Sequence, residues 1–390
     1  MLFLIIFSFC VIYLIFCVPT SEFTFLGRIK LKIKIYGETG LNLLPEGIKN
    51  KILFIYDYLV NKPNPVVQIF YLLLVLLLYL LYYFYGIKKY FPHKVISYNI
   101  VYILYTILFF ALYTFYLCSI SDPGIIKHKN ISFLKKKYPY DFLFNPEKQE
   151  CKKCNIPKIN RSKHCRVCDK CIEKFDHHCI WINNCVGAKN IKYFFYYIFI
   201  HWILVTYAAI LSLSFFYYEI QEKDLLNQIY FNAQTKQQYK TTYFTVFRYL
   251  LWENYTLFAT TFMLLATSIF LMVFISFQFK LSIKNLTSTE KNKQERCISY
   301  MKSIIEALEE IAKNRNLKIE QVKLNHKEIM KYKDIAFRQT DTDLEALNAK
   351  QINEFYSFAK ESIFSYNINP YYKNTPILNI LNKIIYNHEY

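Results

Sequence analysis

Acidic residues and glycine are scarce in this chain. Asp and Glu number 29 against 48 Lys and Arg, which gives a formal net charge of +19, and only 7 of the 390 residues are glycine. A positive chain suits an anionic partner, either nucleic acid or the surface of a membrane leaflet. The sequence contains no nucleic-acid-binding motif and no internal repeat, and its positive charge lies next to long apolar runs. A membrane surface is therefore the expected partner, and nucleic acid is not.

Charged residues are nearly absent from five apolar runs. Hydrophobic residues make up 54% of the chain, and they gather in these runs rather than in short periodic patches. Each run has roughly the 20 residues that a helix needs to cross a bilayer, and helices satisfy their own backbone polar groups in lipid. One run alone could be a buried helix of a soluble protein, but five favour an all-α, multi-pass membrane protein, and their lack of polar side chains argues against a transporter or channel. The runs are Met1–Pro19, Val66–Ile87, Ile96–Ser119, Tyr193–Tyr218 and Thr256–Lys280.

The distribution of Lys and Arg predicts the orientation of these spans. The segments 120–192 and 281–390 are rich in both residues, whereas in the loop 219–255 positive and negative charges balance. Because positive loops stay on the cytosolic side, the first two segments should be cytosolic and the loop luminal. The short basic turn Lys88–Val95 is an exception, since this orientation makes it luminal. Glycosylation sequons at Asn130, Asn160 and Asn285 are all cytosolic in this arrangement, so a glycan on any of them would invert it.

The first apolar run lacks the basic residues that precede the core of a signal peptide. Its positive charges come after it, beginning with Arg28 and Lys30, which favours an uncleaved signal anchor. A cleaved signal peptide is the alternative, and it would leave the central segment of the chain in the lumen. The expected plan is a signal anchor over 1–20, a cytosolic segment over 21–65, a transmembrane hairpin over 66–119, a cytosolic domain over 120–192, a second hairpin over 193–280 and a cytosolic tail over 281–390.

Cysteine and histidine are concentrated in one segment, Cys151–Cys185, which holds seven of the eleven cysteines and three of the eight histidines. The spacing C-x2-C occurs three times and lets two thiolates bind one zinc ion. A disulfide scaffold is the alternative, but the interleaved histidines and the flanking spans favour zinc. Two tetrahedral sites would use eight of the ten groups. A leftover cysteine and histidine would be the minimal pair for a thiol nucleophile and its base, although spacing does not identify them.

Three motifs occur in a characteristic order. Asp122-Pro123-Gly124 follows one span, Asp176-His177-His178-Cys179 lies in the cysteine-rich segment, and Thr287-Ser288-Thr289-Glu290 follows a later span. Together they resemble the DPG, DHHC and TTxE motifs of the DHHC protein S-acyltransferases (palmitoyltransferases), and the first run resembles the extra N-terminal span of a subset of members. Further matching residues are Lys158, Arg161, Ser162, Phe175, Trp181, Asn184, Val186, Gly187, Asn190 and Phe194, with a looser match from Tyr366 to Asn374.

The resemblance implies how the ten metal-binding groups divide. His177 and Cys179 would be the general base and the nucleophile, with Asp176 orienting the imidazole. Both zinc ions would be structural, because four protein ligands leave no open position, and metal binding would replace a hydrophobic core. Ser288 would hydrogen-bond Asp176, and Asp122 and Asn374 would support the site. One zinc would be bound by Cys151, Cys154, His164 and Cys171, and the other by Cys165, Cys168, His178 and Cys185.

The reaction that the resemblance implies is transfer of a long-chain acyl group, palmitoyl, from acyl-CoA to cysteine thiols of membrane-associated proteins. An acyl-enzyme thioester on Cys179 would be the intermediate. Lys158, Arg161 and Lys163 are candidates for binding the CoA phosphates, with solvated side chains as the alternative. The active site would face the cytosol, in the endoplasmic reticulum as in several members with the extra span, or in the Golgi. The last residues, Tyr386–Tyr390, contain no retention signal.

Two residues depart from the family pattern. Ile159 and Ile180 stand where proline is common, but neither change removes a ligand or a catalytic group, so we expect them to affect rate and substrate choice only. The rival function is a non-catalytic, membrane-anchored zinc scaffold or adaptor. A RING-type ligase would need a C-x2-C partner that Cys185 lacks.

The polar stretch Lys291–Glu361 contains apolar residues at helical spacing, among them Ile304, Leu308 and Ala312. This spacing predicts an amphipathic helix. The helix could lie on the membrane surface, pack on the enzyme or form a solvated insert.

Overall fold

The computed structural model describes residues 42–91, 97–140, 149–231, 238–324 and 347–367, together with Tyr36, Thr39, Gly40 and Tyr332. The first expected span, Met1–Pro19, and Asn374 lie outside these residues. Within them, four helices are long and apolar enough to cross a membrane. The predicted class, a helical multi-pass membrane protein with a small cysteine-rich domain, is confirmed. Four of the five expected spans lie within the described residues.

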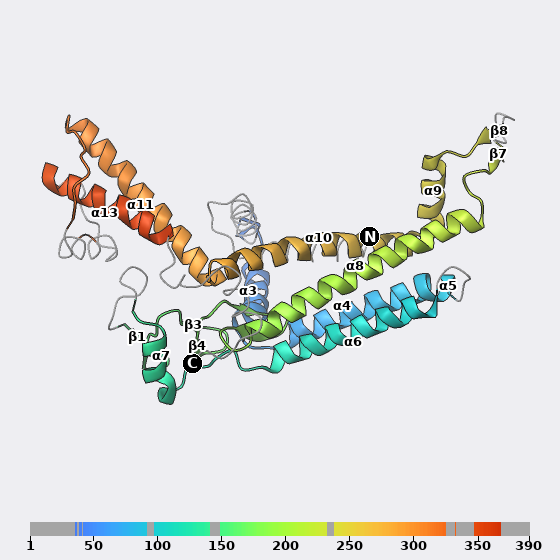
Figure 1. The fold of residues 1–390 in the computed structure, drawn as a ribbon, viewed down its shortest axis with the longest axis horizontal. Helices are drawn as coiled ribbons and strands as arrows, with labels where there is room; N and C mark the ends of the chain where they lie inside the picture. The colour runs from blue at the N-terminus through green and yellow to red at the C-terminus, as the bar shows by residue number, and fades with distance from the viewer. Residues whose placement is uncertain are drawn as a thin grey trace.

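The four spans run side by side along the long axis of the molecule (Figure 1). The third span packs against both the second and the fourth, and side chains such as Leu211, Phe215 and Leu257 form the core between them. Apolar side chains such as Phe109 and Ile269 point outward and are exposed, as expected of surfaces that face lipid. The spans consist of α4 (Val66–Tyr82) continued by the π-helical turn η1 (Tyr83–Ile87) and α5 (Lys88–Tyr90), α6 (Tyr98–Ile120), α8 (Ile191–Glu222) and α10 (Tyr255–Ile283).

A buried carboxylate joins the spans at the end far from the cysteine-rich domain. Glu219 is only 2% exposed, and it accepts hydrogen bonds from Lys223 Nζ at 2.8 Å, Asn254 Nδ2 at 2.8 Å and the Tyr90 hydroxyl. Lys89 in turn donates to Asn254 Oδ1. Lys89 thus belongs to a polar cluster centred on the Glu219 carboxylate, so this basic residue of the turn Lys88–Val95 has polar partners within the protein. The segment between α8 and α10 forms the hairpin β7 (Ile229–Phe231) and β8 (Gln238–Lys240) and the helix α9 (Tyr243–Glu253).

The amphipathic helix of the tail packs against another helix of the tail. Ile304, Leu308 and Ala312 of α11 (Ser288–Asn314) are buried in a cluster with Phe355 and Phe358 of α13 (Ala349–Asn367). The two helices lie together beyond the end of α10 in Figure 1. The amphipathic helix is therefore present, and its apolar face is covered by a second helix of the tail.

The cysteine-rich domain lies at one end of the bundle, where α6 ends and α8 begins (Figure 1). It consists of three small antiparallel hairpins with no large apolar core of their own. The hairpins are β1 (Glu150–Cys151) with β2 (Ile156–Pro157), β3 (Lys163–Cys165) with β4 (Lys170–Ile172), and β5 (His177–Cys179) with β6 (Asn184–Val186), preceded by η2 (His128–Asn130) and α7 (Ile131–Lys137). A further helix, α3 (Glu46–Asn61), precedes α4 at the same end.

Candidate active site

Residues other than glycine form the tight turns of the cysteine-rich domain. Asn155 and Asp169 directly follow the second cysteine of a C-x2-C pair, with φ of 50° and 51°, and Asn183 between β5 and β6 has a φ of 49°. Asn and Asp tolerate this left-handed conformation better than other residues with a Cβ. The scarcity of glycine is therefore compatible with metal-binding turns, because Asn and Asp replace it there.

Two groups of four Cys and His side chains come together on the hairpins. Cross-strand register explains part of this, since His164 pairs with Cys171 and His178 pairs with Cys185. Among the described residues the cysteines are all free thiols, so the structure has no disulfide scaffold there. The groups, in which all ligand atoms lie within 4.8 Å of one another, are Cys151, Cys154, His164 and Cys171, and Cys165, Cys168, His178 and Cys185.

The distances within each group fit a tetrahedral zinc ion. His164 Nδ1 lies 3.3 Å from Cys154 Sγ and 3.8 Å from Cys171 Sγ, and ligand atoms of one tetrahedral zinc are about 3.6 Å apart, given their bond lengths. In the second group His178 Nδ1 lies 3.3 Å from Cys168 Sγ. The free nitrogen of His164, Nε2, is 3.2 Å from Asp169 Oδ1, the carboxylate contact that commonly orients a metal-bound imidazole. Both groups can therefore hold zinc through Nδ1 and three thiolates.

Strand geometry separates the two neighbouring histidines. His177, His178 and Cys179 form β5, and successive side chains of a strand point to opposite faces. His178 joins the second metal group, whereas His177 and Cys179 share the other face. His177 and Cys179, which the resemblance implied as base and nucleophile, therefore lie on one side of β5. The metal group on the other side of the strand holds them in place.

A buried carboxylate network surrounds Asp176, which is 1% exposed. Its Oδ2 lies 2.7 Å from His177 Nδ1 and accepts a hydrogen bond from Ser288 Oγ at 2.9 Å, while Oδ1 accepts one from Ser288 N at 2.7 Å. Thr289 Oγ1 donates to the Asp176 carbonyl at 2.6 Å. Because His177 Nδ1 contacts Asp176 Oδ2, Nε2 is the nitrogen of the His177 ring that does not contact this carboxylate. Ser288 thus hydrogen-bonds Asp176, as the resemblance implied. Its hydroxyl takes the place of the second threonine of the TTxE motif.

Electrostatics favour a proton on His177. Burial disfavours the charged imidazolium, but the hydrogen bonds and negative charges of Asp176 and Cys179 outweigh it and raise the pKa of His177 from 6.5 to about 10. The ring also lies 5.2 Å from the Phe194 ring of α8, edge to face. Cys179 is 7% exposed and packs in an apolar cluster with Phe115 of α6. The reactive pair therefore sits at the junction of the cysteine-rich domain and the spans.

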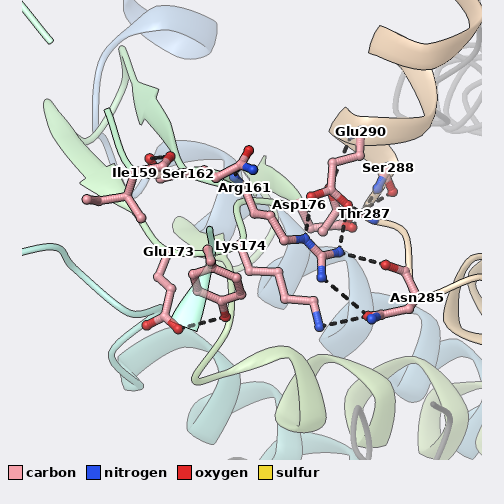
Figure 2. Close-up of polar contacts among 12 residues, drawn as sticks. Ile159, Arg161, Ser162, Glu173, Lys174, Asp176, Asn285, Thr287, Ser288 and Glu290 are labelled. Atoms are coloured by element: carbon pink, nitrogen blue, oxygen red, sulfur yellow. Dashed lines mark hydrogen bonds and ion pairs between the residues drawn. The ribbon is translucent and has the colours of Figure 1, made fainter. Parts of the chain in front are cut away.

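Arg161 joins the cysteine-rich domain to the start of α11. Its Nε and Nη2 donate to the two Glu290 oxygens at 2.6 and 2.8 Å, and Nη2 also donates to the Asn285 carbonyl at 2.6 Å, as Figure 2 shows. Thr287 caps α11 in a reciprocal capping box with Glu290. Burial opposes ionisation of Glu290, but the Arg161 charge outweighs it and lowers the Glu290 pKa. Arg161 is one of three candidates for the CoA phosphates. It lines the cavity described below, but its side chain is only 3% exposed and is engaged by Glu290.

The DPG loop is packed tightly against the domain. Asp122 Oδ1 accepts hydrogen bonds from Gly124 N at 2.9 Å and Ile125 N at 3.0 Å, so Asp122 shapes the turn that follows α6. A Cβ on Gly187 would lie only 2.4 Å from the Pro123 carbonyl oxygen. Sequence reasoning gave no role to Asn184, yet its Nδ2 donates to the carbonyls of Cys118, Ser119 and Ser121 at the end of α6.

A basic cavity of about 400 Å³ lies between the cysteine-rich domain and the start of α11, and Lys158, Lys163, Lys293 and Arg296 are among its lining residues. Burial, together with the positive charges of Arg296 and Arg166, lowers the pKa of Lys163. Positive charges gathered in a concave site are stabilised by a bound anion. Lys158 and Lys163 thus remain candidates for phosphate contacts, and Lys293 and Arg296 are residues that the sequence did not indicate.

Comparison with known proteins agrees with this geometry. A family model described as DHHC palmitoyltransferase matches residues 144–295. The chain is 30% identical to rat palmitoyltransferase ZDHHC4 over 301 residues, which are 74% of this chain and 84% of that protein. It is 35% identical to palmitoyltransferase swf1 of Schizosaccharomyces pombe over 167 residues, 43% of this chain and 45% of that protein. This chain therefore belongs to the DHHC palmitoyltransferase family.

Proposed function

We propose that this protein S-palmitoyltransferase works through an acyl-enzyme thioester on Cys179. The observation that carries the proposal is the arrangement of β5, in which Cys179 shares a face with an Asp176-bound His177 while His178 joins a metal group. The two metal groups use eight of the ten Cys and His side chains of the segment. Only a thiol and its neighbouring imidazole are left for chemistry.

The reaction has two thioester exchanges. The Cys179 thiolate attacks the carbonyl carbon of palmitoyl-CoA, a new C–S bond forms, and the bond to the CoA sulfur breaks, with His177 giving its proton to the departing thiolate. A cysteine thiol of the protein substrate then attacks the acyl-enzyme, His177 accepts its proton, and the Cys179 thiolate is released. Asp176 and Ser288 keep the imidazole in orientation throughout. Each exchange replaces one thioester by another, so neither step is strongly uphill.

We assign a structural role to two zinc ions. Each group offers one imidazole nitrogen and three thiolates, a donor set typical of closed structural sites. Bound zinc would cross-link hairpins that have no large core of their own and so fix β5. No step of the transfer needs the metal as a Lewis acid.

The basic cavity is the proposed site for the CoA phosphates. Lys158, Lys163, Lys293 and Arg296 line it, and charge-assisted bonds to phosphate are strong. Arg161 acts in this proposal by holding Glu290 beside the cavity, not by binding phosphate. We expect Lys158→Gln and Lys293→Gln to raise the KM for palmitoyl-CoA more than they lower kcat, which initial-rate measurements can separate.

The proposed topology places the cysteine-rich domain in the cytosol, where acyl-CoA is available, with membrane-associated proteins carrying cysteines near the bilayer as substrates. The endoplasmic reticulum is the proposed location and the Golgi the alternative. A glycan on Asn130, Asn160 or Asn285, detected as a shift in mobility that a glycosidase removes, would contradict this orientation.

The decisive experiment is incubation of the purified full-length protein with labelled palmitoyl-CoA. We expect a hydroxylamine-sensitive label that Cys179→Ser abolishes, and a loss of labelling rate of about 100-fold or more in His177→Ala. Cys297→Ser, which changes a cysteine outside the site, should label normally. Equal labelling of Cys179→Ser, or no label on the unsubstituted protein, would leave the non-catalytic scaffold as the better explanation.

A further inference from the structure

The helix α3 carries an apolar stripe that no described residue covers. At about 100° per residue, Ile48, Ile52, Ile55 and Leu59 fall on one side of this helix. The first three are 50%, 39% and 55% exposed. None of the hydrophobic clusters formed by the described residues includes a residue of α3. An exposed stripe of this kind marks a contact with protein or membrane.

The other amphipathic helix of the chain shows what a protein-covered stripe looks like here. Ile304, Leu308 and Ala312 of α11 are 6%, 0% and 1% exposed because α13 packs over them. The stripe on α3 has the same spacing but far greater exposure. Among the described residues, no helix covers this stripe as α13 covers that of α11.

The borders of the stripe match a membrane surface. Tyr56 and Lys49 lie along one edge of the stripe on the helical wheel, and Tyr58 and Lys51 lie along the other. Tyrosine is enriched where a bilayer meets water, and a lysine beside an inserted face can extend its ammonium to the headgroups. The opposite side of the helix carries Glu46, Asn50, Asp57 and Asn61 and suits water. Leu53 and Phe54, which are 43% and 68% exposed, lie between this side and the two edges of the stripe.

A rigid elbow connects α3 to the first described span. Asn64 is 6% exposed, and its Nδ2 donates to the carbonyls of Tyr58 at 2.7 Å and Lys62 at 2.9 Å, while its Oδ1 accepts from Val66 N at 3.1 Å. One side chain thus ties the end of α3 to the first residue of α4. In Figure 1, α3 runs across the direction of α4, so the elbow holds it roughly parallel to the plane of the membrane that α4 enters.

The side of the membrane follows from the neighbours of α4. Gln68 near its start donates to Ser119 Oγ at 3.1 Å, near the end of α6, and α6 leads directly into the cysteine-rich domain. Tyr71 lies 6.0 Å from the ring of Trp181, two residues after Cys179. The start of α4 is therefore level with the reactive pair.

We propose that α3 is an interfacial helix that lies in the bilayer surface, on the leaflet next to the cysteine-rich domain. Ile48, Ile52, Ile55 and Leu59 insert among the upper acyl chains, and Glu46, Asn50 and Asp57 face water. Through the Asn64 elbow, the depth of α3 sets the height of α4 and of Tyr71. The helix thereby fixes how far Cys179 lies from the lipid in which acyl-CoA and the protein substrates are anchored.

Two tryptophan variants of the full-length protein in phosphatidylcholine liposomes test this proposal. Ile52→Trp places the probe in the stripe, and Asn50→Trp places it two residues away, on the opposite side of the same helix. Quenching by brominated phosphatidylcholine and by aqueous iodide is measured against the unsubstituted protein, which contains three tryptophans. We expect the added Ile52→Trp fluorescence to be quenched by the brominated lipid and not by iodide, with the reverse for Asn50→Trp.

Two outcomes would overturn the proposal. Iodide quenching of both variants would mean that α3 lies in water. Quenching of Ile52→Trp by neither reagent would mean that protein covers the stripe, either another segment of this chain or a second copy. If either variant elutes as an aggregate in size-exclusion chromatography and so has not folded, Ile55→Trp and Asp57→Trp supply a second pair on the same two sides.

Discussion

The cysteine-rich domain and the membrane bundle hold the reactive pair from two sides by different means. The hairpins of the domain have strands of two or three residues, too short to be stable by pairing alone, and they depend on metal groups and on buried polar links such as Arg161–Glu290. The bundle helices α4, α6, α8 and α10 run 17 to 32 residues and satisfy their backbones internally. Loss of one metal ligand or one polar link should therefore unfold the cysteine-rich domain, whereas loss of one contact should change the stability of the bundle little.

Metal removal should produce the largest difference between the two regions. Chelation of zinc, or Cys168→Ser, should unfold the domain and abolish labelling of Cys179, because structural zinc sites contribute on the order of 10 kcal/mol to folding. The far-UV circular dichroism of the helices should change little. Loss of most of the helical signal on chelation would show that the bundle depends on the domain, contrary to this comparison.

Breaking the ion pair between Arg161 and Glu290 should have the next largest effect on the stability of the cysteine-rich domain. Arg161→Ala leaves a partly buried carboxylate without its cation and should lower the free energy of unfolding of the domain by about 3 kcal/mol. Denaturant unfolding followed by release of zinc measures this. Lys152→Ala is the control, since it removes an exposed positive charge from the same domain.

The same pair has a defined pH dependence. The Glu290 pKa is lowered in the folded state, so its contribution is complete above the ordinary value of 4.5 and is lost as the pH falls through the folded pKa. The stability difference between the unsubstituted protein and Glu290→Gln should therefore be constant near neutral pH and narrow only under acidic conditions. A difference that grows on acidification would contradict the assignment.

Closing the space at Gly187 should have an intermediate effect. A Cβ there would meet the Pro123 carbonyl oxygen at 2.4 Å and Ile172 Cγ2 at 2.6 Å, so Gly187→Ala should cost about 1–3 kcal/mol or more and slow acylation. Gly47 of α3 is the matched control, because nothing lies within 4 Å of its added Cβ. Gly47→Ala should leave acylation unchanged, and equal damage from both variants would refute the steric explanation.

A polar pair inside the bundle should show the smallest effect. Thr206 Oγ1 and Ser268 Oγ lie 2.6 Å apart and connect α8 to α10. Such pairs between membrane helices contribute about 0.6 kcal/mol on average, so Thr206→Val should barely change thermal stability in detergent. A loss as large as that of Arg161→Ala would show that the bundle also depends on single contacts.

The sequence predicted features that are local or periodic. Four spans follow from runs of apolar residues, and the density of Cys and His indicated zinc before any fold was known. The division of ligands was not derivable from spacing, because it depends on the register of β3 with β4 and of β5 with β6. The family resemblance supplied it.

What the sequence did not predict depends on contacts between distant residues. Arg161 lies among basic residues and suggested phosphate binding, whereas its partner Glu290 is 129 residues away. Glu290 is recognisable locally as part of a capping box, but nothing local indicates its ion pair. The apolar stripe of α3 lies in a segment that was predicted only to be cytosolic, and the elbow at Asn64 that orients it appears only in the fold.

The alternation along β5 has a consequence for errors of assembly. Cys179 and a metal ligand differ only in the side of the strand on which they lie, and all of the cysteines involved are thiols of the same kind. A one-residue slip against β6 would turn Cys179 toward the metal and convert the nucleophile into a ligand. That misfolded form would still bind zinc and would acylate nothing, so zinc binding alone does not select the correct register. The hydrogen bonds from Ser288 and Thr289 to Asp176 are further contacts that favour it.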